Sequence, residues 1–172
     1  MSETIDSKTQ DNKAQVWLKP EQIEEMRNAI VEESANYLAS RNDALLAVLA
    51  DTGLRVAEAV ALDVEMLDLD EGIIMLPPEI QKDYPNDNTP EYVEIELASE
   101  TVRTLRTYLS NRWQDSLALF PSRQSERMTK ESVRNVVTKA AESAQVRPYT
   151  TGGRGEPSNI TPHTYRHSVA YR

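Results

Sequence analysis

Arg55 and Glu58 lie where the sequence predicts a break between two helices. Gly53 is a typical left-handed helix stop, so one helix is expected to end there and the next to begin at Arg55. Free N–H groups at the start of a helix favour an anion, as does a guanidinium group. Glu58 follows three residues later, which places it on the same helix face as Arg55, where it can orient the arginine. The pattern predicts an anion-binding position.

Three more residues could act on the same kind of ligand. His163 and Arg166 are three residues apart, so their side chains are expected together at the start of a later helix. Lys82 lies in a polar connection between two predicted strands. Each feature also has an ordinary explanation, because Arg–Glu pairs at this spacing are most often solvated surface pairs and single loop lysines are usually solvated. The informative observation is their combination in this order.

The elements that must position these residues are mostly helical. A helix is expected from Pro20, with Ile23, Met26, Ile30 and Leu38 on one face. Further helices are predicted over residues 42–50, 55–62, from Ser99 onward, over 129–144, and from Thr161–Pro162 to the last residue. Residues 72–76 and 92–97 alternate as strands around a turn-rich connection, and residues 149–159 are expected to form a Gly-rich loop. The predicted fold class is mainly α with a small antiparallel β-hairpin or three-stranded sheet.

The domain organisation is expected to be simple. Residues 1–15 are polar and predict a disordered lead or linker, and residues 16–172 are expected to form one domain. No apolar run approaches the roughly 20 residues of a membrane span, so the expected location is the cytoplasm. There are no cysteines and only two histidines, which excludes disulfides and leaves little for a metal site, so neither a metal nor a cofactor is expected.

The net charge argues against a nucleic-acid partner. The chain has 28 acidic and 19 basic residues, for a formal charge of −9, whereas proteins that bind nucleic acid are usually basic at least in patches. One hypothesis is an acidic outer surface suited to a high-salt, halophilic cytoplasm, with a few cations kept at one site. Activity that peaks at low salt and is lost in molar potassium chloride would contradict it.

Two longer runs resemble motifs of the tyrosine recombinases, the phage integrase family. Residues 52–62, Thr-Gly-Leu-Arg-Val-Ala-Glu-Ala-Val-Ala-Leu, resemble the first arginine motif of that family. Residues 163–170, His-Thr-Tyr-Arg-His-Ser-Val-Ala, resemble its His-x-x-Arg motif, and residues 119–122, Leu-Phe-Pro-Ser, are similar to the segment between them. The resemblance covers about residues 18–172. It implies the catalytic-domain fold of the family, incomplete at the carboxy terminus.

The resemblance also implies a reaction and a role for each residue. In this family a tyrosine hydroxyl attacks a DNA phosphodiester without a metal ion, forming a 3′-phosphotyrosyl link and freeing a 5′-hydroxyl. Arg55 and Arg166 would hold the nonbridging oxygens, for which planar, permanently charged guanidinium groups are suited. Lys82 would protonate the departing 5′-oxygen, and His163 would hydrogen-bond the phosphate or help move a proton at neutral pH. Glu58 would hold Arg55 in place.

The nucleophile is not expected in this sequence. In the family it lies a few tens of residues past His-x-x-Arg, and neither Tyr165 nor Tyr171 matches that position. The chain alone is therefore expected to bind double-stranded DNA without cleaving it, unless another molecule supplies the tyrosine. It is expected to be a monomer, whereas a full-length parent would act as a tetramer on DNA. Two alternatives stay open: a noncatalytic DNA-binding remnant or regulator with the same fold, and a helical interaction domain with no role on DNA.

Overall fold

The computed structural model describes residues 16–81 and 91–169. The helices in these ranges are α2 (Pro20–Glu33), α3 (Asn36–Thr52), α4 (Val56–Ala61), α5 (Ser99–Asn111), α6 (Lys130–Ala144) and α7 (Pro162–Val169). The strands are β1 (Leu67–Asp68), β2 (Ile73–Leu76), β3 (Val93–Glu96), β4 (Tyr149–Thr150) and β5 (Gly153–Arg154). The predicted class, mainly α with a small antiparallel sheet, is confirmed. None of these helices is long and apolar enough to cross a membrane.

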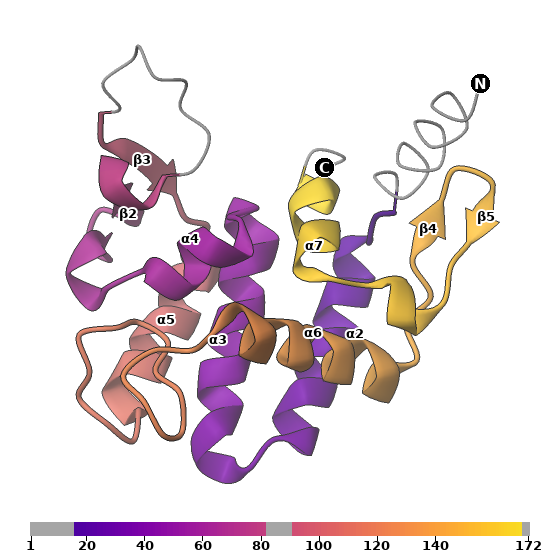
Figure 1. Ribbon diagram of the computed structural model, residues 1–172, viewed down its shortest axis with the longest axis horizontal. Coiled ribbons are helices and arrows are strands. Elements are labelled where there is room, and N and C mark those ends of the chain that lie inside the picture. The colour runs from indigo at the N-terminus through magenta and orange to yellow at the C-terminus, as the bar shows by residue number, and fades with distance from the viewer. Residues whose placement is uncertain (1–15, 82–90, 170–172) are drawn as a thin grey trace.

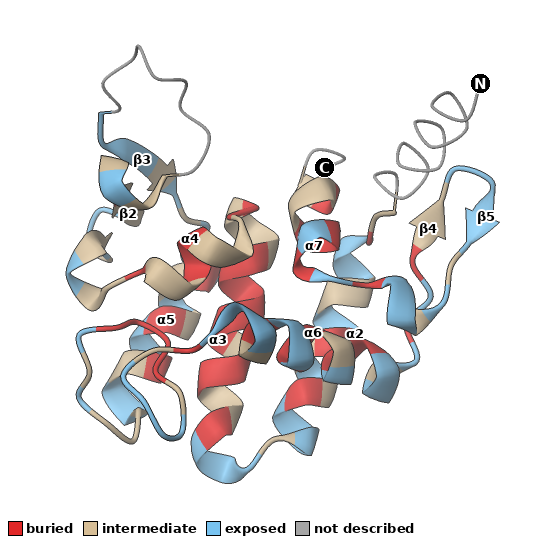
Figure 2. Ribbon diagram, viewed as in Figure 1, coloured by how far each residue is buried: buried red, intermediate tan, exposed pale blue. Residues whose placement is uncertain are grey.

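Helix α3 forms the centre of the molecule. Its side chains Leu45, Leu46, Val48 and Leu49 are completely buried, and α2, α5 and α7 pack around it (Figure 1). Figure 2 shows that buried residues follow α3 along most of its length. The apolar run of residues 44–49 is buried without interruption, as expected for a helix in the interior of a domain. The residues that end α3 therefore follow directly on a buried part of the fold.

The boundary between α2 and α3 differs from the sequence prediction. Helix α3 begins at Asn36 rather than at about residue 42, and Leu38 lies on α3 instead of the first helix. Helix α2 ends because Ser34 has extended backbone angles (φ −87°, ψ 148°), and its hydroxyl donates a hydrogen bond to the Ile30 carbonyl at 2.5 Å. No glycine or proline marks this break, so the hydrophobic pattern appeared continuous.

The main sheet has three antiparallel strands in the order β1-β2-β3. Ile74 on β2 lies opposite Ile95 on β3, and Ile74 is completely buried. Short 3-10 turns at Val64–Met66 and Pro78–Ile80 flank β1 and β2. The connection from β2 to β3 includes residues 82–90, which are outside the described residues.

The segment expected to be a Gly-rich loop instead forms a small hairpin. Strands β4 and β5 pair with Tyr149 opposite Arg154, and a 3-10 turn at Pro157–Asn159 follows. Trp17 extends the pairing, since Trp17 and Tyr149 exchange both backbone hydrogen bonds at 3.1 and 2.9 Å. The start of the described chain is thereby joined to the hairpin that precedes α7 (Figure 1).

A cationic pocket as candidate active site

A pocket of about 220 Å³ lies where the first residues of α4, α6 and α7 meet. Three of the predicted residues line it: Arg55, His163 and Arg166. Helix α6 adds Lys130 and Arg134, and no acidic residue of the described chain lines the pocket. We call this the central pocket. Cationic side chains and the amino-terminal ends of helices both favour negative charge, so the central pocket is suited to an anion.

A left-handed turn places Arg55 at the rim of the central pocket. Gly53 has φ 66° and ψ 23°, a conformation that favours glycine, and it ends α3 as predicted. Arg55 then stands immediately before α4 in an extended conformation. The Glu58 carboxylate accepts a hydrogen bond from the Arg55 backbone N–H at 3.0 Å and is only 7% exposed. Glu58 therefore fixes the backbone from which the arginine side chain projects.

Arg166 is held by the same turn. Its Nη1 donates a hydrogen bond to the Gly53 carbonyl at 2.7 Å, across 113 residues of sequence. Helix α7 starts at Pro162, and the Thr161 N–H is bonded to the Thr164 hydroxyl at 3.0 Å. The two arginine-containing segments are thus joined at one carbonyl. This contact leaves further N–H groups of Arg166 for a ligand, since a guanidinium group carries about five.

The two histidines lie one turn apart on α7. The His163 and His167 rings stack with centroids 6.4 Å apart and an angle of 15° between their planes. His163 is exposed and lines the central pocket. Burial lowers the pKa of His167 below its usual 6.5, and the neighbouring His163 lowers it further. His167 is therefore favoured in its neutral form beside the more exposed His163.

Sequence reasoning missed Lys130 and Arg134. Both are exposed and lie in the first turns of α6, four residues apart, so they share a helix face. Thr129 caps this helix by accepting a hydrogen bond from the Ser132 N–H at 3.1 Å. The i, i+4 spacing of two cations behind a capping threonine was the available signal. Their proximity to Arg55 depends on tertiary packing of α4 on α6.

The other sequence candidates are placed differently. Lys82 and Tyr171 lie outside the described residues. Tyr165 is completely buried, its hydroxyl points to the Met26 sulfur at 3.6 Å, and burial strongly raises its pKa. These properties are those of a core residue rather than of a nucleophile. Within the described ranges no group of three histidine or acidic residues is placed to hold a metal ion.

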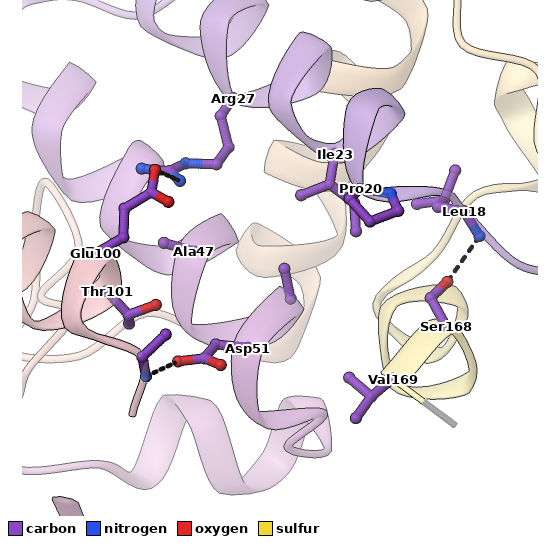
Figure 3. Close-up of a pocket in the computed structure, with 12 residues that line it drawn as sticks. Leu18, Pro20, Ile23, Arg27, Ala47, Asp51, Glu100, Thr101, Ser168 and Val169 are labelled. Atoms are coloured by element: carbon purple, nitrogen blue, oxygen red, sulfur yellow. Dashed lines mark hydrogen bonds and ion pairs between the residues drawn. The ribbon is translucent and has the colours of Figure 1, made fainter. Parts of the chain in front are cut away.

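A second pocket lies near the end of α7 and has a different character. It has a volume of about 180 Å³ and a largely apolar wall that includes Leu18, Ile23 and Val169. Figure 3 shows its polar groups engaged within the fold: the Ser168 hydroxyl accepts from the Leu18 N–H at 2.7 Å and Asp51 accepts from the Ala98 N–H at 2.8 Å. The central pocket, in contrast, is lined by several cationic side chains.

Comparisons with known proteins agree with this fold. The sequence profile of the phage integrase family matches residues 16–172. The tyrosine recombinase XerC of Pseudomonas syringae pv. tomato is 31% identical over 135 residues, covering 78% of this chain and 40% of XerC. XerC of Azotobacter vinelandii is 28% identical over 156 residues, covering 89% of this chain and 45% of that relative. The chain spans less than half the length of these relatives.

Solved structures show the same fold. The crystal structure of XerA recombinase matches with a TM-score of 0.66 and 24% identity, over 88% of this chain and 48% of XerA. The XerH site-specific recombinase bound to its difH substrate matches with a TM-score of 0.65 and 20% identity, over 90% of this chain and 41% of XerH. Fold and pocket together define a helical domain with a cationic pocket. The chain belongs to the phage integrase family, as a tyrosine recombinase catalytic domain.

Proposed function

We propose that this chain contributes the catalytic domain of a site-specific recombinase that breaks and rejoins double-stranded DNA through a 3′-phosphotyrosyl intermediate. The observation that carries the proposal is the convergence of Arg55, His163 and Arg166 on one pocket that no carboxylate of the described residues lines. Relatives with the same fold are site-specific recombinases, and the XerH structure was solved with its DNA substrate. In this proposal the ligand of the central pocket is a backbone phosphate of DNA.

Each residue of the central pocket has a defined task in the proposed reaction. Attack on the phosphorus builds negative charge on the nonbridging oxygens, and Arg55 and Arg166 stabilise it through charged hydrogen bonds. His163 donates a hydrogen bond to one of these oxygens. Glu58 acts as a positioning residue, through the Arg55 backbone. Lys82 protonates the departing 5′-oxygen as general acid.

Two cations of α6 extend the proposed phosphate site. Lys130 and Arg134 line the central pocket without touching the Arg166–Gly53 contact that organises it. We assign them to binding the DNA backbone rather than to the chemical step. The attacking tyrosine is a residue other than Tyr165, because a fully buried hydroxyl with a raised pKa cannot reach a phosphate in solution. In the same proposal, the full-length protein acts on DNA as a tetramer.

The test measures DNA binding by a variant with both pocket arginines replaced. Arg55→Gln with Arg166→Gln should reduce the salt slope of duplex binding by about 1, since the two arginines share one phosphate and each phosphate contact contributes about 0.9. The loss of affinity between about 50 and 200 mM salt should then shrink by about three- to fourfold. In a protein that carries its tyrosine, trapping of the DNA–protein adduct should slow by about 10²–10³-fold for each arginine.

A matched control separates a site effect from a general loss of charge. Arg103→Gln with Arg123→Gln removes two exposed arginines that lie outside the central pocket. This control should bind DNA much more like the parent than the Arg55, Arg166 variant does. Thermal unfolding of both variants checks that they are folded. If the pocket variant keeps the parent's slope and affinity, the central pocket is not a phosphate site and the proposed function fails.

A further inference from the structure

A second group of cations lies beyond the central pocket, at the opposite end of α6. Lys19, Arg147 and Arg154 are exposed and line one hollow together with Tyr149. The Arg154 guanidinium lies 4.2 Å from the ring centroid and the Lys19 ammonium 4.6 Å from it. We call these four residues the hairpin cluster. None of them was singled out by the sequence motifs.

The hairpin cluster is held in a fixed arrangement. Trp17 stacks on Tyr149 with ring centroids 6.2 Å apart, and the two residues also exchange backbone hydrogen bonds. Arg154 Nε and Nη2 both donate to the Arg147 carbonyl, at 3.2 and 2.8 Å. Arg147 Nε donates to the Gly155 carbonyl at 3.1 Å. Side chains that are ordered before binding lose less conformational freedom when a ligand arrives.

The charges around the hairpin cluster leave its cations available to an anion. Glu21 and Glu25 on α2 also line this hollow, and Glu156 lies 3.8 Å from Arg147 Nη2 in an exposed pair. Exposed pairs of this kind contribute little. Among the described residues, no carboxylate lies within ion-pair distance of Lys19 or Arg154. Arg154 therefore keeps N–H groups that internal acceptors do not use.

The length of α6 relates the hairpin cluster to the central pocket. Lys130, the first residue of α6, lines the pocket, and the hairpin follows the last turn of the same helix (Figure 1). Fifteen helical residues span about 22 Å at roughly 1.5 Å per residue. Phosphates along one DNA strand advance about 3.4 Å each, so this distance corresponds to roughly six nucleotides.

We propose that Lys19, Arg147 and Arg154 form a second DNA-backbone site, which binds phosphates roughly six nucleotides from the phosphate in the central pocket. This inference rests on the proposed function, since it assigns the DNA partner to another surface of the same chain. Tyr149 acts as the platform that keeps Lys19 and Arg154 in place. In this proposal the segment that the sequence predicted as a Gly-rich loop contacts the duplex.

The first test measures how DNA binding depends on salt. The triple variant Lys19→Gln, Arg147→Gln, Arg154→Gln keeps polar side chains at all three positions but removes the charges. Its salt slope should fall by about 2 to 3 relative to the parent, at about 0.9 for each lost phosphate contact. A charge-conserving Arg154→Lys variant should behave like the parent. The matched control, Arg103→Gln with Arg106→Gln and Arg123→Gln, should keep a steeper slope than the hairpin variant.

The second test measures proximity directly and needs no known target sequence. A photo-crosslinking benzoylphenylalanine at Thr151, in the hairpin turn, should form an adduct with duplex DNA on irradiation. The same probe at Val31 on α2, which is 42% exposed, should not. If the hairpin variant keeps the parent's salt slope and the probe at position 151 forms no crosslink, this inference is overturned. DNA binding through Arg55 and Arg166 still stands in that case. A parent that binds no DNA overturns both proposals.

Discussion

Two arginine environments at opposite ends of α3 show how the same side chain takes on different tasks. Arg166, beside the Gly53 turn that ends α3, is half-buried and donates one hydrogen bond to the fold. Arg41, near the start of α3, is 6% exposed and donates three, two to the Asn42 side chain and one to the Pro121 carbonyl. The Arg41 guanidinium donates its hydrogen bonds within the fold. The Arg166 guanidinium lines the central pocket.

The surroundings of Arg41 explain why its charge is tolerated. No carboxylate in the described ranges lies within ion-pair distance, and the Trp113 ring covers it at 5.8 Å. Burial lowers the pKa of Arg41, and this effect outweighs the opposing influence of the nearby Tyr108 and Tyr37. A buried charge is stable only when its hydrogen bonds are satisfied. Through its hydrogen bond to the Pro121 carbonyl, Arg41 therefore joins the segment between α5 and α6 to the first turns of α3.

The largest expected contrast comes from replacing each arginine by methionine. Arg41→Met leaves the Pro121 carbonyl and the Asn42 side chain without their donor, and the free energy of unfolding should fall by about 2 kcal/mol. Its DNA affinity, measured under conditions where it is folded, should match the parent's. Arg166→Met should do the opposite, with reduced DNA binding and a smaller loss in urea unfolding. If the two variants changed DNA affinity equally, or changed the free energy of unfolding equally, the distinction between a structural Arg41 and a ligand-binding Arg166 would be contradicted.

The sequence predicted the local parts of the site better than their assembly. The Gly53 stop and the start of α7 at Pro162 were predictable because each depends on the backbone preference of one or two residues. The bond from Arg166 to the Gly53 carbonyl was not, since it joins segments 113 residues apart. That Glu58 acts on the Arg55 backbone also required the structure.

Two missed features share one physical reason. The β4–β5 hairpin depends on its pairing with Trp17, more than 130 residues away in sequence, so its glycines alone suggested a loop. Lys130 and Arg134 face the central pocket only because α6 packs against α4. Patterns in a single sequence report local preference, whereas tertiary contacts decide these positions. The early start of α3 was missed for the opposite reason, because no local signal marks the break.

A substitution at Gly53 tests how the turn that ends α3 positions Arg166. A Cβ at Gly53 would lie 3.2 Å from the Val169 Cγ2, and the φ of 66° is unfavourable for other residues. Gly53→Ala should reduce the free energy of unfolding by about 1–2 kcal/mol through backbone strain. It should also push α7 away from the turn and weaken the hold on Arg166. We expect weaker DNA binding by the folded variant.

Gly72 provides the matched control for that variant. Its φ of 68° is nearly the same, but a Cβ there meets only ordinary contacts at 3.7 Å, with Leu97 and Val102. Gly72→Ala should therefore lose a similar amount of stability and keep the parent's DNA affinity. If both alanine variants bind DNA equally, the carbonyl contact of Gly53 with Arg166 does not position the pocket.

The smallest expected effect concerns His167, the more enclosed of the two stacked histidines. Burial lowers its pKa in the folded state, and the charge of His163 lowers it further. The unfolded chain therefore binds more protons just below pH 6.5, and the stability gained from a neutral His167 is lost as the pH falls through that range. His167→Gln should lose less stability than the parent between pH 8 and pH 5, measured by urea unfolding at each pH. His163→Gln should also reduce the loss, but by less, since it removes only the second cause of the shift and leaves the burial of His167 in place.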